Sequence, residues 1–131
     1  MSQLDELVRD LQRSANLATD WRVRREVLRP IARLNTPEAL QTILDHLGRE
    51  PNSSVRIRAV QVLGESADAS VVPALVRHYK QEWDSGVRLR VVSAIAALAP
   101  PAAARSFLEE ASSDRRERVS LHARKLLTEL G

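Results

Sequence analysis

The chain contains no cysteine and few glycines, aromatic residues or lysines. The absence of cysteine excludes disulfide bonds and thiolate metal sites, and it suits a protein of the cytoplasm. The four glycines do not form a phosphate-binding loop, and no serine, histidine and acid have the arrangement of a nucleophilic enzyme. We therefore expect a non-catalytic protein with no cofactor and no bound metal.

Long apolar runs are also missing from the sequence. No segment approaches the ~20 apolar residues that are needed to span a bilayer. At the start of the chain, Asp5, Glu6 and Asp10 stand where a signal peptide would need an apolar run. These features predict a soluble, cytoplasmic protein that makes no contact with a membrane.

Positive charge comes almost entirely from arginine, because the 131 residues include 18 Arg and 2 Lys, with a net charge of +3. The guanidinium group can pair with a carboxylate or a phosphate through two parallel hydrogen bonds. The arginine bias therefore leaves two interpretations open, which are salt bridges within the fold and binding of an anionic ligand.

Valine recurs at Val23, Val55, Val87 and Val119, a regular period of about 32 residues that is typical of a tandem repeat. Apolar residues follow these valines at steps of four, and a second set of apolar columns begins at Leu40 and recurs with the same period. Both spacings are typical of amphipathic helices. One such helix pair cannot bury its apolar face alone, so successive pairs must stack on one another.

We therefore predict an all-α fold of stacked antiparallel helix hairpins, with about three and a half repeats in a single domain, residues 1–131. The predicted half repeat spans residues 3–15, the full repeats span 20–48, 52–80 and 84–112, and the closing half repeat spans 115–130.

Helix starts are marked by residues that can accept hydrogen bonds from the free N–H groups of a first turn. Three of them lie three residues before a repeated valine, and these are Asp20, Asn52 and Asp84. Thr36, Asp68 and Pro100 hold the matching places before the second helices of the repeats.

The segment from Asp84 to Ile95 resembles the first-helix signature of HEAT-like repeats, of the type also called phycobilisome-lyase HEAT-like. Residues 52–63 look like a second copy, residues 20–31 match less closely, and residues 116–127 match least. In that last segment Arg116 replaces the Asp or Asn of the cap, and Ser120 replaces the arginine. The resemblance covers nearly the whole chain and implies a right-handed α-solenoid that serves as a protein-binding scaffold.

An arginine follows each of the first three repeated valines, giving Arg24, Arg56 and Arg88. We predict that they form a structural ladder between adjoining repeats, with loop carbonyl groups and the side chains of Asp20, Asn52 and Asp84 as acceptors. The resemblance to HEAT-like repeats favours this ladder. An anion-binding ridge is the alternative.

Polar residues at repeated places on the second helices predict a concave face that binds a partner. Arg13, Asp45, Arg77 and Glu109 alternate in sign and suggest a salt-bridge ladder. His46, His78 and Glu110 could ligate a metal, but their spread over two repeats favours a solvated polar face. The predicted partner-binding residues are Gln41, Thr42, Asp45, His46, Arg77, His78, Arg105 and Glu109.

Two tryptophans, Trp21 and Trp83, fall in the turns between repeats. The Trp83 ring is predicted to pack over the turn at Val87 and Arg88, and the alternative is an exposed anchor for a partner.

Three functions remain open. The first is a non-catalytic module that binds another protein on the second-helix face. The second is binding of DNA through the arginine-rich surface, which the lack of an uninterrupted cationic stripe disfavours. The third is an accessory or chromophore-lyase-like role, which only the resemblance suggests. End-to-end self-association through apolar edges is also open, with Leu4, Leu7 and Leu11 at one end and Leu126 and Leu130 at the other.

Overall fold

The computed structural model describes residues 2–16 and 20–131, and every regular element in these ranges is a helix. The α-helices are α1 (Gln3–Asn16), α2 (Trp21–Arg33), α3 (Pro37–Leu47), α4 (Ser53–Glu65), α5 (Val72–Gln81), α6 (Ser85–Leu98), α7 (Pro101–Ala111) and α8 (Glu117–Leu130). A 3₁₀ turn, η1 (Ala69–Val71), precedes α5. No helix in the described ranges is long and apolar enough to cross a membrane.

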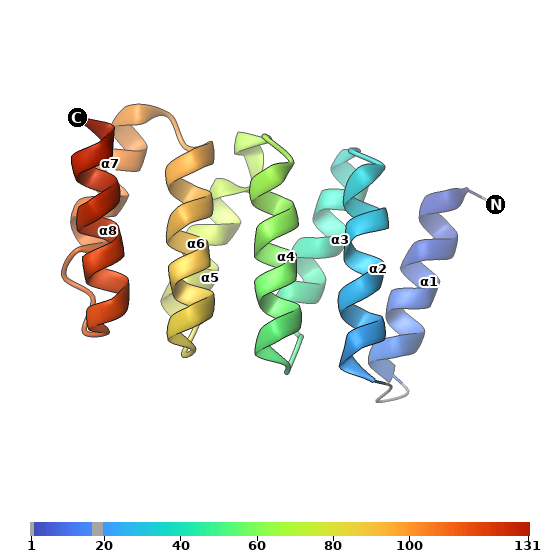
Figure 1. The fold of residues 1–131 in the computed structure, drawn as a ribbon. Coiled ribbons are helices and arrows are strands. Elements are labelled where there is room, and N and C mark those ends of the chain that lie inside the picture. The colour runs from blue at the N-terminus through green and yellow to red at the C-terminus, as the bar shows by residue number, and fades with distance from the viewer. Residues whose placement is uncertain (1, 17–19) are drawn as a thin grey trace. The chain divides into compact units, whose positions relative to one another are not determined.

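The chain divides into two compact units, Met1–Ser66 and Ala67–Gly131. In the first unit α2 and α4 lie side by side with α3 behind them, and α1 packs on α2 (Figure 1). In the second unit α6 and α8 lie side by side, α7 contacts both, and α5 packs on α6 (Figure 1). The organisation of residues 1–131 as one domain stays a prediction.

Helix starts follow the predicted caps. The side chains of Asp20, Asn52 and Asp84 each accept a backbone N–H from the first turn of α2, α4 and α6, at 2.8 to 3.0 Å. Thr36 caps α3 in the same way, and Asp68 caps the turn η1. In the described chain α7 and α8 begin without a side-chain cap.

The apolar columns predicted from the valine repeat form most of the core, but Val27 and Leu127 are only half-buried and Val23 is exposed. Val55, Val87 and Val119 are fully buried, whereas Val23 is 47% exposed. The prediction that Val23 belongs to the core is therefore wrong. Val23 lies in the first turn of α2, at the end of the helix.

The helices α2 and α4 end in the same backbone conformation. Leu34 and Ser66 are the C-cap residues of these two helices. The residues that follow them, Asn35 and Ala67, have positive φ angles of 50° and 58°. This left-handed conformation closes many helices, and glycine or asparagine adopts it with the least strain. The two turns hold the same position in successive sequence repeats.

Candidate functional site

A buried salt bridge joins α2 to the connection between α3 and α4 in the first unit. The Nε of Arg24 donates to Glu50 Oε1 at 2.8 Å, and its Nη2 donates to Glu50 Oε2 at 3.1 Å. The Glu50 side chain is completely buried and that of Arg24 is 10% exposed. This bidentate geometry fixes both the distance and the orientation of the two groups.

The carboxylate of Glu50 has further hydrogen-bond partners that lie before and after it in the sequence. His46 Nε2, from the last turn of α3, lies 2.7 Å from Glu50 Oε1, and the backbone N–H of Asn52 donates to Oε2 at 2.8 Å. Arg56 donates from α4 to the carbonyl groups of Glu50 and Pro51 at 3.1 and 2.9 Å. The connection is therefore held at its side chains and at its backbone.

These contacts decide the protonation state of Glu50. Burial by itself raises the pKa of a carboxyl group, but the hydrogen bonds from His46, Arg24 and Asn52 outweigh burial here and lower the pKa of Glu50 to about 2. Glu50 is therefore a carboxylate at neutral pH and keeps its partners.

A related cluster surrounds Arg88 in the second unit. Its guanidinium donates to Asp114 Oδ2 from Nε at 3.0 Å and from Nη2 at 2.6 Å, and to the carbonyl groups of Tyr79 and Glu82 from Nη1 at 2.6 and 2.9 Å. The Tyr79 hydroxyl also donates to Asp114 Oδ2. The cluster therefore joins α6 to the end of α5 and to the turn before α8.

The Tyr79 ring is part of this cluster. The Arg88 guanidinium lies 3.9 Å from the ring centroid, and Phe107 of α7 meets the ring edge to face, with centroids 5.2 Å apart. Burial, together with the hydrogen bond to Asp114, raises the pKa of Tyr79 to about 12. Burial opposes ionisation of Asp114, but hydrogen bonds led by that from Tyr79 lower its pKa below the usual value.

Arg24, Arg56 and Arg88 each contact a helix connection, but the side-chain acceptors of Arg24 and Arg88 differ from those predicted. Described contacts of Asp20, Asn52 and Asp84 include the helix caps given above, and Asp20 also pairs with Arg22 at 3.0 Å. The carboxylates that receive Arg24 and Arg88 are Glu50 and Asp114 instead. These contacts do not show Asp20, Asn52 and Asp84 in the predicted role of ladder acceptors. The loop carbonyl groups, in contrast, do accept hydrogen bonds from Arg56 and Arg88.

The sequence carries a signal for these acids. Acidic residues recur with the period of the valines at Glu50, Glu82 and Asp114, and each follows the arginine of its repeat at the same interval. Glu82 is 3% exposed, and His78 contacts it as His46 contacts Glu50, with Nε2 to Oε1 at 2.7 Å. Glu82 Oε2 also accepts the backbone N–H of Asp84 at 3.0 Å.

The predicted partner-binding residues separate into exposed and covered groups. Gln41, Asp45, Arg77, Arg105 and Glu109 are exposed on α3, α5 and α7. Thr42 and His78 are half-buried and bonded within their own helix turns, Thr42 to the Glu38 carbonyl. His46 is 1% exposed, so a solvated position was wrong for it, because the buried Glu50 carboxylate draws the imidazole inward.

The predicted salt-bridge ladder along the second helices is wrong in both units. Among the described side chains, no ion pair joins Arg13 to Asp45 or Arg77 to Glu109. Asp45 accepts a hydrogen bond from Gln41 of its own helix at 2.9 Å. The charges of Arg77, Asp45 and Glu109 therefore face solvent.

The two tryptophans differ in exposure. Trp21 is half-buried, with the guanidinium carbons of Arg22 and Arg25 4.9 and 5.1 Å from its ring centroid. Trp83 is 68% exposed, so the prediction that its ring packs over the turn at Val87 is wrong. Its carbonyl group accepts a hydrogen bond from Arg116 at 3.0 Å.

A shallow cleft of about 380 Å³ lies where α2 and α4 end in the first unit. Its lining includes Arg29 and Glu65, which form a salt bridge of 2.8 Å, and the exposed residues Arg33 and Asn35. Within residues 2–16 and 20–131, no group of three or more His, Asp and Glu side chains is placed to hold a metal ion.

Comparisons with known proteins agree with the helical repeat. The HEAT repeats family matches residues 43–128. Among solved structures, the chain is similar to human deoxyhypusine hydroxylase in complex with glycerol, with a TM-score of 0.83 and 20% sequence identity. That match covers 98% of this chain and 43% of the hydroxylase, so the chain spans less than half of that protein and shares its fold. None of the curated proteins matches the sequence.

The phycobilisome-lyase type, the handedness of the solenoid and the repeat period stay predictions. Because the family match extends over well over half of the residues, the chain belongs to the HEAT-repeat family.

Proposed function

We propose that the protein is a non-catalytic interaction module that binds another protein through the exposed polar residues of its second helices. The observation that carries the proposal is the exposure of the charged side chains of Asp45, Arg77 and Glu109. All three are exposed, they include charges of both signs, and no ion pair between described residues neutralises them. The buried arginine clusters, in contrast, have their charges satisfied inside the fold.

Mixed charge on these helices favours a protein partner over a polyanion. Nucleic acid would need a continuous field of positive charge, and Asp45 and Glu109 interrupt such a field. A folded polar protein can present charges of both signs, which gives the complex its orientation and its specificity. His46 is left out of the proposed surface because it is buried.

Site-specific photo-cross-linking tests the proposal. A benzophenone amino acid is placed singly at Asp45, Arg77 or Glu109, and at Glu26 and Thr128 as exposed controls on first helices. We expect the three second-helix positions to capture one and the same protein in cells of the source organism, and the controls to capture none of it.

Two results would contradict the proposal. One is an identical set of captured proteins from second-helix and control positions, which indicates random collision. The other is capture of nucleic acid in place of protein at Arg77, together with binding of a DNA duplex that weakens steeply as salt rises.

A further inference from the structure

Ser93 of α6 and His122 of α8 form a polar contact on the first-helix side of the second unit. Ser93 Oγ lies 2.6 Å from His122 Nε2, and both side chains are half-buried. Neither residue takes part in the arginine clusters or in the proposed protein-binding surface. The contact therefore lies outside both groups of residues.

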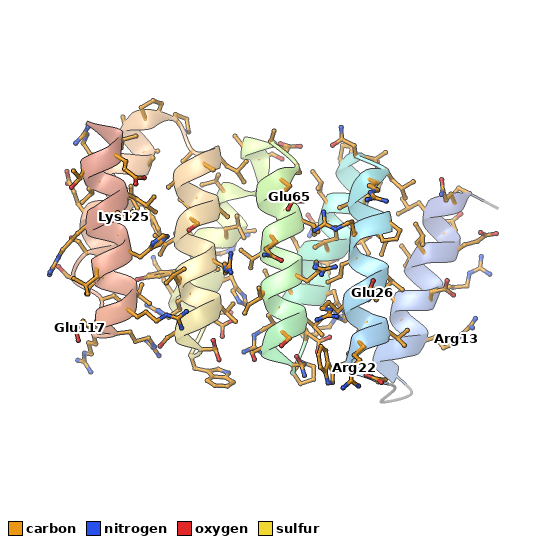
Figure 2. All side chains as sticks on the ribbon, viewed as in Figure 1. Arg13, Arg22, Glu26, Glu65, Glu117 and Lys125 are labelled. Carbon is orange, nitrogen blue, oxygen red and sulfur yellow. The ribbon has the colours of Figure 1, made fainter. Side chains whose placement is uncertain are left out.

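Two cations flank this contact. Arg90 precedes Ser93 by three residues on α6, and Lys125 follows His122 by three residues on α8, so each cation shares a helix face with its neighbour. Arg90 and His122 hold the same repeat position on two helices that pack together. Figure 2 labels Lys125 on α8. The three-residue spacing therefore places one cation beside Ser93 on α6 and the other beside His122 on α8.

The local charge around His122 is positive. Burial lowers the pKa of His122, Lys125 and Arg90 lower it further, and Glu129 opposes them. Both cations are exposed, and within the described chain neither one has an ion-pair partner. With Glu129 as the one carboxylate that acts on His122, two cations leave an excess of positive charge at the contact.

We propose that Arg90, Ser93, His122 and Lys125 bind the phosphate group of a phosphate monoester. Such a group carries about −1.5 to −2 charge near neutral pH and has three strong acceptor oxygens. The guanidinium of Arg90, the ammonium of Lys125 and the hydroxyl of Ser93 are donors for those oxygens. A bound dianion also favours the protonated form of His122, which then supplies a further N–H donor.

A carboxylate fits this cluster less well. It carries one negative charge and two oxygens, against the two charges and three oxygens of a phosphate dianion, so it balances less of the positive charge and offers fewer acceptors to these donors. The inference is independent of the proposed protein-binding surface, since that surface uses the second helices α3, α5 and α7.

Histidine NMR tests the proposal directly, because the chain has only three histidines and His122→Gln identifies the signals of His122. Inorganic phosphate is titrated into the full chain at pH 7 and constant ionic strength. We expect saturable shifts of the His122 signals and a rise in its pKa as phosphate binds. Arg90→Gln and Lys125→Gln should each weaken binding by about tenfold, the effect of losing one charge-assisted hydrogen bond.

Arg115→Gln is the matched control, because Arg115 is an exposed arginine of the same unit and stands outside the cluster. It should leave phosphate affinity unchanged, and circular dichroism checks that every variant stays helical. Shifts that chloride reproduces at equal ionic strength would overturn the proposal. So would phosphate affinities that are the same in wild type, Arg90→Gln and Lys125→Gln.

A second arm separates two sources of the phosphate group. A short phosphoserine peptide and its unphosphorylated form are titrated in the same way. Tighter binding of the phosphopeptide than of inorganic phosphate assigns the site to a modified protein. Equal affinity assigns it to small phosphate monoesters. Equal binding of the unphosphorylated peptide would overturn the proposal.

Discussion

Val55 and Val23 occupy the same place in successive repeats, but their side chains are 0% and 47% exposed. The free energy that an apolar side chain contributes depends on the area it removes from water and on how closely its neighbours pack. Val55 is a buried residue of α4, whereas Val23 lies in the first turn of α2 with its side chain largely in solvent. Identical residues in a repeat protein therefore contribute unequally to stability.

We expect Val55→Ala to lower the free energy of unfolding by about 2 kcal/mol, because it removes two buried methyl groups and leaves a cavity. Val23→Ala should change it by less than about 0.5 kcal/mol, since Val23 is largely exposed and alanine favours the helix. Urea denaturation followed by circular dichroism measures both. Equal losses for the two variants would show that burial does not differ as described.

At the same scale, residue chemistry limited what the sequence could predict. The roles of Arg24 and Arg88 followed from their spacing, because a buried arginine needs fixed acceptors. The acceptors Glu50 and Asp114 lie in connections, which show no helical periodicity, so only their recurrence with the repeat marks them in the sequence. The burial of His46 depends on Glu50 and was missed for the same reason.

Among the elements, the ends of α2 and α4 show how backbone conformation and residue type can disagree. Asn35 tolerates a positive φ, because its short polar side chain is among the few that adopt the left-handed region. Ala67 has a φ of 58° at the equivalent turn, where its Cβ crowds the backbone. Such a residue costs on the order of 1 kcal/mol.

Ala67→Gly should therefore raise the free energy of unfolding, by about 0.5–1 kcal/mol, because glycine adopts this conformation without strain. Ala97→Gly is the control of opposite sign, since Ala97 is exposed in the last turn of α6 and glycine is less favourable than alanine in a helix. Thermal or urea unfolding of both variants checks the pair. A loss of stability for Ala67→Gly would contradict the strain assigned to this turn.

Element starts were easier to predict than element ends. Asp20, Asn52 and Asp84 use short polar side chains whose capping role follows from local geometry, so the starts of α2, α4 and α6 could be placed from the sequence. Asp68 marks the start of the 3₁₀ turn in the same way, but neither the 3₁₀ geometry of this turn nor the left-handed conformation of Ala67 carries such a signal. Alanine has no side-chain preference that marks a turn, so only the structure reveals them.

Across the whole molecule, the buried carboxylates connect stability to pH. Glu50 has a pKa of about 2 in the fold against a usual value of 4.5, and the pKa of Asp114 is also lowered. A carboxyl group whose pKa is lower in the folded state stabilises the fold fully above its unfolded pKa. That contribution is lost as pH falls through the folded pKa. For Glu50 the window runs from about 4.5 down to about 2.

The helical repeat could be predicted from the regular spacing of the valines, because the apolar columns must meet for the chain to fold, and the resemblance of residues 84–95 to HEAT-like repeats implied the family. Charge pairing over the second helices could not. Arg77 and Glu109 alternate in sign at one repeat position, but their side chains extend into solvent instead of joining each other. A matching position in the sequence does not fix the direction of a long flexible side chain.

Glu50→Gln tests the claim that the arginine and acid clusters hold the helix connections, and the quantity to measure is its free energy of unfolding at pH 7. We expect a loss of about 3–5 kcal/mol, because the buried Arg24 is left without its carboxylate. Glu65→Gln, which breaks the exposed pair with Arg29, should lose less than about 1 kcal/mol. Equal, small losses in the two variants would contradict the claim.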